Sequence, residues 1–142
     1  MEQKPSILYI DDEESNLRIF KMAFRKNYTI YTALDTQEAR KILAEQVVHI
    51  IITDQKMPNE TGIDFLKAII KHYPDPVRMV LSGFSDMESI VEAINEVRIF
   101  KFLQKPWSQE DVKKNLDEAV EFYESEQIKN KALQEYLSKQ TT

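Results

Sequence analysis

The chain has five polar residues that lie at or just after the ends of short apolar runs and could take part in chemistry: Asp11, Asp12, Asp54, Ser82 and Lys105. Short apolar runs of this kind are typical of buried strands. The carboxyl ends of parallel strands form one shared rim, which is where open α/β sheets bind ligands. We therefore expect one site with three carboxylates, one hydroxyl and one ammonium group.

Three carboxylates on one rim repel one another, so their clustering lowers stability unless a cation or a proton compensates. Oxygen ligands favour a hard divalent cation, and a few carboxylates combined with a phosphate favour Mg²⁺. No His or Cys stands near these positions, which disfavours zinc. For Asp11 and Asp12 alone, the alternative is a helix N-terminal cap after the first strand. Asp54 at a second strand end favours the metal site.

Asp54 could also act as a nucleophile, because a carboxylate can attack phosphorus and form an aspartyl phosphate. Such a transfer needs positive charge and hydrogen-bond donors around the phosphoryl oxygens. Lys105 would supply the charge, Ser82 the hydroxyl, and Gly83 the room for the phosphoryl group. Taken singly, Lys105 is typical of a surface lysine and Ser82 of a strand-end cap. Only their occurrence together indicates a phosphoryl site.

The elements that must position these residues alternate along the chain. Five short, mainly apolar segments are predicted to be strands covered on both faces: Ser6–Ile10, Tyr28–Ala33, Val48–Thr53, Val77–Ser82 and Phe100–Leu103. Amphipathic helices follow them, with apolar faces that begin at Leu17, Ala39, Phe65, Met87 and Val112. Capping-box spacing marks four helix starts, Asp35 with Glu38, Thr61 with Asp64, Ser85 with Glu88 and Ser108 with Asp111.

This alternation predicts an α/β fold, a three-layer αβα sandwich on a five-stranded parallel sheet with right-handed crossovers. We choose the flavodoxin-like strand order 2-1-3-4-5 because it places the first and third strands side by side and brings the three aspartates together. Periodicity alone does not fix that order. Pro74 and Pro76 are expected to stop the third helix before the fourth strand.

The composition is that of a globular protein, with 142 residues, 42% hydrophobic and 30% charged. A net charge of -5 argues against non-specific nucleic-acid binding. The chain has no Cys, which fits a reducing cytoplasm, and we expect a cytoplasmic protein with no secretion signal and no membrane segment. His49 and His72 are interpreted as structural or simply exposed residues. Trp107 is interpreted as a packing residue, with docking of an output module as the alternative.

Four elements, in order and with their spacing, resemble the receiver domains of two-component response regulators over about residues 6–124: Asp11-Asp12, Asp54-x-x-Met57-Pro58-x-x-x-Gly62, Ser82-Gly83 and Phe102-x-x-Lys105-Pro106. The resemblance implies the fold of a chemotaxis regulator and a phosphoacceptor function that depends on Mg²⁺. It implies that Asp54 accepts a phosphoryl group from a histidine kinase or a phosphotransfer protein. Asp12 and Asp54 would bind Mg²⁺ directly, Asp11 partly through water, and Lys56 through its backbone carbonyl.

The resemblance also implies a switch pair, Ser82 and Phe102, in which the hydroxyl moves toward the phosphoryl group and the ring turns inward. Many members of the family have Tyr where this chain has Phe102, so a polar readout at that position is lost. The peptide before Pro106 is expected to be cis. We hypothesise that bulky Phe84 hinders water and slows hydrolysis of the phosphate. Output would pass through the face formed by the fourth helix, the fifth strand and the fifth helix.

Residues 1–124 are thus expected to form the receiver domain and residues 125–142 a helical extension or linker. That tail is either a solvated helix or the start of a coiled coil that leads to an output module or pairs with a second chain. Two other functions stay open, an aspartyl-phosphate hydrolase and an unphosphorylated scaffold. Such hydrolases use a second carboxylate two residues after the nucleophile, where this chain has Lys56. We therefore expect a switch and not an enzyme.

Overall fold

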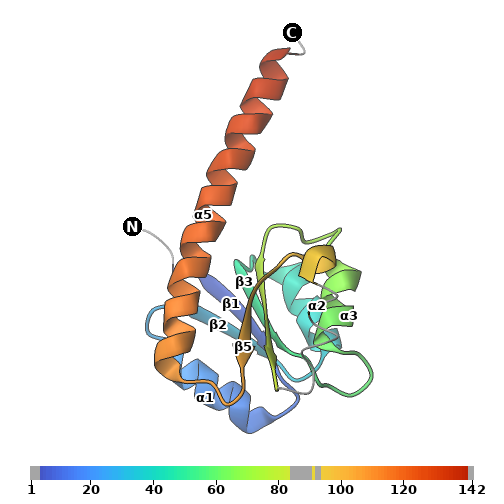
Figure 1. The fold of residues 1–142 in the computed structure, drawn as a ribbon, viewed down its shortest axis with the longest axis vertical. Helices are drawn as coiled ribbons and strands as arrows, with labels where there is room; N and C mark the ends of the chain where they lie inside the picture. The colour runs from blue at the N-terminus through green and yellow to red at the C-terminus, as the bar shows by residue number, and fades with distance from the viewer. Residues whose placement is uncertain (1–3, 84–90, 92–93, 141–142) are drawn as a thin grey trace.

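The sheet is as predicted. The computed structural model describes residues 4–83, 91 and 94–140 of the chain. Its five strands are β1 (Ser6–Ile10), β2 (Thr29–Ala33), β3 (Ile50–Asp54), β4 (Val77–Ser82) and β5 (Ile99–Gln104). All neighbouring pairs are parallel and the order is β2-β1-β3-β4-β5. The predicted order is therefore confirmed. β1 and β3 lie side by side (Figure 1), and the chain adds β2 on one side of this pair and β4 and β5 on the other.

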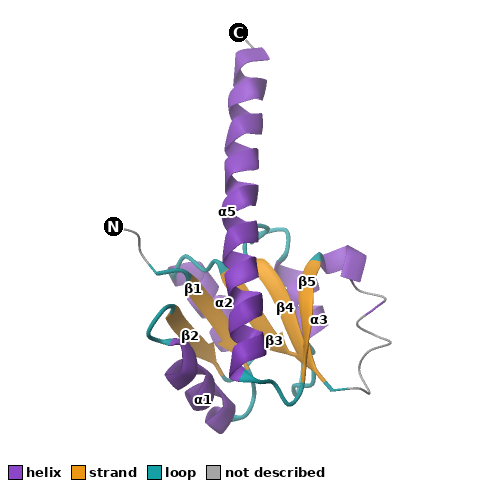
Figure 2. Cartoon of the chain, turned by 60° about the vertical axis from the view of Figure 1, so that its left-hand side comes forward, coloured by secondary structure: helices purple, strands orange, loops and turns teal. Residues whose placement is uncertain are grey.

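Helices cover both faces of the sheet, which gives the predicted three layers (Figures 1 and 2). They are α1 (Glu14–Phe24), α2 (Thr36–Glu45), α3 (Gly62–Ile69) and α5 (Gln109–Gln140), and residues 94–97 are also helical. Side chains of α1 and α5 pack in one apolar cluster, and those of α2 and α3 in another. Successive residues of a strand face opposite sides, so Ile7 and Tyr9 belong to the first cluster and Leu8 and Ile10 to the second.

Three of the predicted helix starts are confirmed by their hydrogen bonds. In each, the side chain of the capping residue accepts from the backbone N–H three residues later: Asp35 from Glu38 at 2.8 Å, Thr61 from Asp64 at 3.1 Å, and Ser108 from Asp111 at 3.1 Å. The Ser85–Glu88 pair lies outside the described residues, as do Phe84 and two residues of the predicted fourth-helix face, Met87 and Ile90. The caps fix where the chain turns from strand to helix near the rim that carries the acids.

Several predicted boundaries are wrong. The second strand begins at Thr29 rather than Tyr28, and the fifth strand is Ile99–Gln104 rather than Phe100–Leu103. The third strand is Ile50–Asp54 rather than Val48–Thr53, because its pairing with β1 begins at Ile50 and its pairing with β4 continues to Asp54. Asp54 is thus the last residue of the strand, not the first residue after it. The α3 helix ends at Ile69, well before Pro74, since the chain must leave the helix early to return to the start of β4.

The predicted helical tail is continuous with the last helix. The α5 helix has 32 residues and runs past position 124 without a break, and its second half projects beyond the sheet (Figures 1 and 2). Several apolar side chains on this projecting part are exposed: Ile128, Leu133, Tyr136 and Leu137. In the described ranges, no helix is both long and apolar enough to cross a membrane.

Candidate functional site

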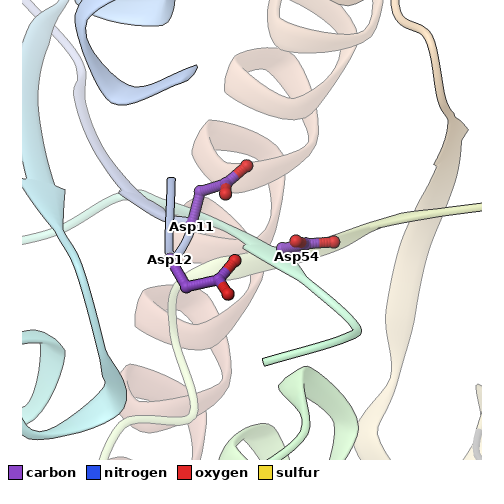
Figure 3. A group of neighbouring side chains, drawn as sticks. All are labelled: Asp11, Asp12 and Asp54. Atoms are coloured by element: carbon purple, nitrogen blue, oxygen red, sulfur yellow. The ribbon is translucent and has the colours of Figure 1, made fainter. Parts of the chain in front are cut away.

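Three carboxylates meet at the carboxyl end of the sheet. Asp11 and Asp12 directly follow β1, and Asp54 is the last residue of β3. Each offers one oxygen atom, and these three oxygens lie within 4.8 Å of one another (Figure 3). Asp11 and Asp54 are buried, whereas Asp12 is exposed. The cluster therefore has an open side, and its donors are all oxygens, the set that hard divalent cations prefer.

Asp11 is held in place by three donors. The Tyr9 hydroxyl donates to its Oδ2 at 2.9 Å, the Asn16 side-chain amide donates to the same oxygen at 3.1 Å, and the backbone N–H of Glu13 donates to its Oδ1 at 3.0 Å. The alternative role of Asp11 and Asp12 as the helix cap is wrong, because the N-cap of α1 is Glu13. Asp11 is fully buried, so these bonds fix the direction of its carboxylate.

Lys105 reaches Asp54 from the loop that follows β5. Its Nζ lies 2.9 Å from Oδ1 of Asp54. Burial raises the pKa of Asp54, the ion pair with Lys105 opposes that shift, and the negative charges of Asp11 and Asp12 add to it. Burial works against the charged form of Lys105, but its pair with Asp54 prevails and raises its pKa. Lys105 therefore stays cationic and partly compensates the repulsion among the acids.

Ser82, Phe102 and Pro106 of the predicted site lie on or just after the neighbouring strands β4 and β5. Ser82 ends β4, is buried, and its backbone carbonyl accepts from the N–H of Lys105 at 3.0 Å. Phe102 on β5 is partly buried against the cluster that contains α2 and α3. The Lys105–Pro106 peptide is cis, as predicted. Lys56, in the loop after β3, is exposed.

Sequence reasoning missed the supporting roles of three residues at the site. Tyr9 was read only as part of a strand, yet its hydroxyl contacts Asp11. Gln55 accepts at its Oε1 from the backbone N–H of Ile63 at 2.9 Å and so ties the start of α3 to the end of β3. Gly62 lies so close that an added Cβ would meet the carbonyl oxygen of Asp54. The one signal for Tyr9 was a hydroxyl-bearing ring in an otherwise aliphatic run beside the acids.

Comparisons with known proteins agree with this geometry. The family model for the response regulator receiver domain matches residues 7–117. The hydrogenase transcriptional regulatory protein HoxA of Bradyrhizobium diazoefficiens is 36% identical over 118 residues, and its namesake from Cupriavidus necator is 32% identical over 120 residues. These matches take in 83% and 84% of this chain but 24% and 25% of the relatives, so the chain spans about a quarter of their length.

Solved structures give the same result. The signal receiver domain of an HD domain-containing protein from Pseudomonas fluorescens Pf-5 superposes with a TM-score of 0.82 at 31% identity, covering 87% of this chain and 99% of that one. A structure described as an adenylate cyclase from Rhodopirellula baltica superposes with a TM-score of 0.88 at 26% identity, covering 93% and 98%. With the family model, the strand order and the acid cluster in agreement, the chain belongs to the family of response regulator receiver domains.

Proposed function

We propose that the domain is a phosphorylation-controlled switch in which Asp54 accepts a phosphoryl group from the phosphohistidine of a kinase or phosphotransfer protein. One observation carries the assignment to this residue. Asp54 ends a strand in the middle of the sheet and pairs with Lys105 at 2.9 Å, while two further carboxylates stand beside it. Asp11 by contrast has both oxygens engaged by hydrogen bonds to its own neighbourhood.

In the proposed transfer, one oxygen of Asp54 attacks phosphorus. A P–O bond forms while the P–N bond to the donor imidazole breaks, and the imidazole keeps the electron pair and takes up a proton. Lys105 then moves its contact from Oδ1 to a phosphoryl oxygen, and the hydroxyl of Ser82 donates to another. These groups stabilise charge that grows during the transfer, which is where fixed donors and cations have their largest effect.

Mg²⁺ is the cofactor that fits the donor set. Asp12, Asp54 and the backbone carbonyl of Lys56 would bind it directly, and Asp11 partly through water. When bound, the cation neutralises charge on the acids and on the phosphoryl oxygens. Three features support this choice: the oxygen-only cluster, its exposed side at Asp12, and the raised pKa of Asp54, which burial causes and to which the charges of Asp11 and Asp12 add.

The response passes, in this proposal, through Ser82 and Phe102 to the face formed by the fourth helix, β5 and α5. Residues 1–124 form the receiver unit, and residues 125–142 form an extension that joins it to an output module or pairs with a second copy. The exposed apolar side chains beyond position 124 support a partner there. A helix in water gains most of its stability by packing its apolar side chains against another surface. The matched relatives are transcriptional regulators of about three and a half times the length of this chain.

Intact-mass spectrometry after treatment with acetyl phosphate and Mg²⁺ tests the proposal. The wild-type chain should gain one phosphoryl group, Asp54→Asn should gain none, and Asp64→Asn, an exposed acid of α3 used as matched control, should behave like the wild type. Repeated turnover, with many phosphates released per chain, would instead favour the hydrolase. Lack of both modification and Mg²⁺ binding would favour the unphosphorylated scaffold.

A further inference from the structure

The acid cluster has a second connection to the loop that precedes α5, besides the Asp54–Lys105 pair. It runs through Tyr9, a residue with no exposed surface whose hydroxyl donates to Oδ2 of Asp11 at 2.9 Å. Alternate residues of a strand face the same side, so Tyr9 and Asp11 both point toward the layer that holds α1 and the start of α5. The phenol thus lies between a buried carboxylate and that layer.

Aromatic side chains fix the ring of Tyr9. It stacks on Phe20 of α1 with ring centres 4.3 Å apart and an angle of 20° between the planes. Phe20 in turn meets the Trp107 ring at 5.9 Å, edge to face, and Phe24 lies 6.0 Å from the same ring. Figure 1 shows the start of α5 beside α1, where these rings meet. Offset and edge-to-face pairs of this kind hold each other in position.

Trp107 is connected to Tyr9 through the ring of Phe20, which stacks on Tyr9 on one side and meets Trp107 edge to face on the other. Burial, and then the neighbouring Asp11, raise the pKa of the Tyr9 phenol, so that its hydroxyl stays protonated and donates to Asp11. Trp107 stands two residues after Lys105 and two before Gln109, the first residue of α5.

We propose that Tyr9 is a positioning residue for the metal site, and that the contacts from Trp107 through Phe20 and Tyr9 to Asp11 couple cation binding to the loop at the start of α5. The proposal rests on the Mg²⁺ site described above. Partners in the outer shell orient metal-binding carboxylates, and their loss typically costs roughly 10- to 100-fold in metal affinity. Two acids of the cluster are then tied to the same loop, Asp54 through Lys105 and Asp11 through Tyr9.

The test is Mg²⁺ titration of the 142-residue chain by calorimetry and by fluorescence of Trp107, its single tryptophan. Tyr9→Phe keeps the ring that stacks on Phe20 and removes only the hydroxyl. It should weaken Mg²⁺ binding about 10-fold and remove most of the Mg²⁺-induced change in Trp107 emission. Trp107→Ala, which removes the ring that packs against Phe20, should weaken binding in the same direction, measured by calorimetry. This variant also carries the test if Tyr9→Phe does not fold.

The matched control is Tyr28→Phe. Tyr28 is also buried and its hydroxyl also donates to a carboxylate, Oδ1 of Asp117 at 2.7 Å, but Asp117 is not part of the acid cluster. A structural effect of losing a buried phenol would appear in both Tyr variants, whereas only Tyr9→Phe should change Mg²⁺ affinity. Wild-type affinity and emission in folded Tyr9→Phe would overturn this inference and leave the phosphoacceptor proposal intact. A wild-type chain that binds no Mg²⁺ would overturn both.

Discussion

Gly62→Ala is expected to destabilise the domain because the start of α3 packs directly against the backbone that carries Asp54. An added Cβ would press on the carbonyl oxygen of Asp54 and lie 2.9 Å from Cγ2 and 3.1 Å from Oγ1 of Thr53. These neighbours belong to a buried central strand, so they cannot move aside cheaply. The backbone of Gly62 is not in the left-handed region, which means that the requirement is for space rather than for glycine's conformational freedom.

Overpacking of this kind costs about 1–3 kcal/mol. We expect a loss of about 2 kcal/mol in the free energy of unfolding, and with about 4 °C per kcal/mol for a domain of this size, a fall in Tm of roughly 8 °C. Urea denaturation and thermal scans followed by circular dichroism would measure both quantities. The m-value should stay unchanged, because the surface exposed on unfolding is the same.

Gly83→Ala is the matched control, since these are the two glycines of the chain. A Cβ at Gly83 would have no heavy atom of the described structure within 4 Å beyond its chain neighbours, and its φ is not positive. Restricting the unfolded chain should then leave stability unchanged or raise it by about 0.5 kcal/mol. Equal stabilities for the two variants would refute the reasoning, because the close packing of Gly62 would have no measurable cost.

Three further predictions follow from single contacts. Stability should decline as the pH falls below 6.5, because burial lowers the pKa of folded His49, whose Nδ1 accepts from the N–H of Ser6 at 2.9 Å, and the unfolded chain takes up the proton first. Urea titrations at several pH values should show a smaller decline in His49→Gln than in the wild type. An unchanged decline in His49→Gln, or loss of the decline in the exposed control His72→Gln, would contradict the assignment. Asp35→Ala should cost about 1 kcal/mol, because the N–H of Glu38 loses its acceptor, and an unchanged urea midpoint would contradict the cap. Lys105→Gln should slow phosphorylation by acetyl phosphate about 100-fold, while Lys101→Gln, which alters a surface pair with Glu118, should keep the wild-type rate.

The strands were predictable because they are buried on both faces and each reads as a short apolar run. Their order was a choice: requiring the acids at Asp11 and Asp54 to meet places only the first and third strands side by side. Helix starts were predictable where a short polar side chain caps the third amide, as at Asp35 and Thr61. The early end of α3 was not, since the return to β4 is set by tertiary packing and no residue between Ile69 and Pro74 is a strong helix breaker.

The charged residues of the site were predictable, but the residues that hold them in place were not. Carboxylates and a lysine at strand ends stand out against apolar runs, so Asp54 and Lys105 could be paired from their positions alone. Tyr9 could not be assigned, because a tyrosine in a strand looks like any other core aromatic until the direction of its hydroxyl is known. Gly62 fitted a spacing pattern, but the pattern does not reveal that the carbonyl oxygen of Asp54 lies against it.

Reductive trapping of the acyl phosphate tests the central claim most directly. Labelled borohydride converts an aspartyl phosphate to an alcohol, and peptide mapping then locates the label. After treatment with a phosphoryl donor and Mg²⁺, the label should lie on Asp54 alone and should be absent when Mg²⁺ is chelated. Label on Asp11, on Asp12 or on an acid outside the cluster, or incorporation that does not depend on Mg²⁺, would contradict the account.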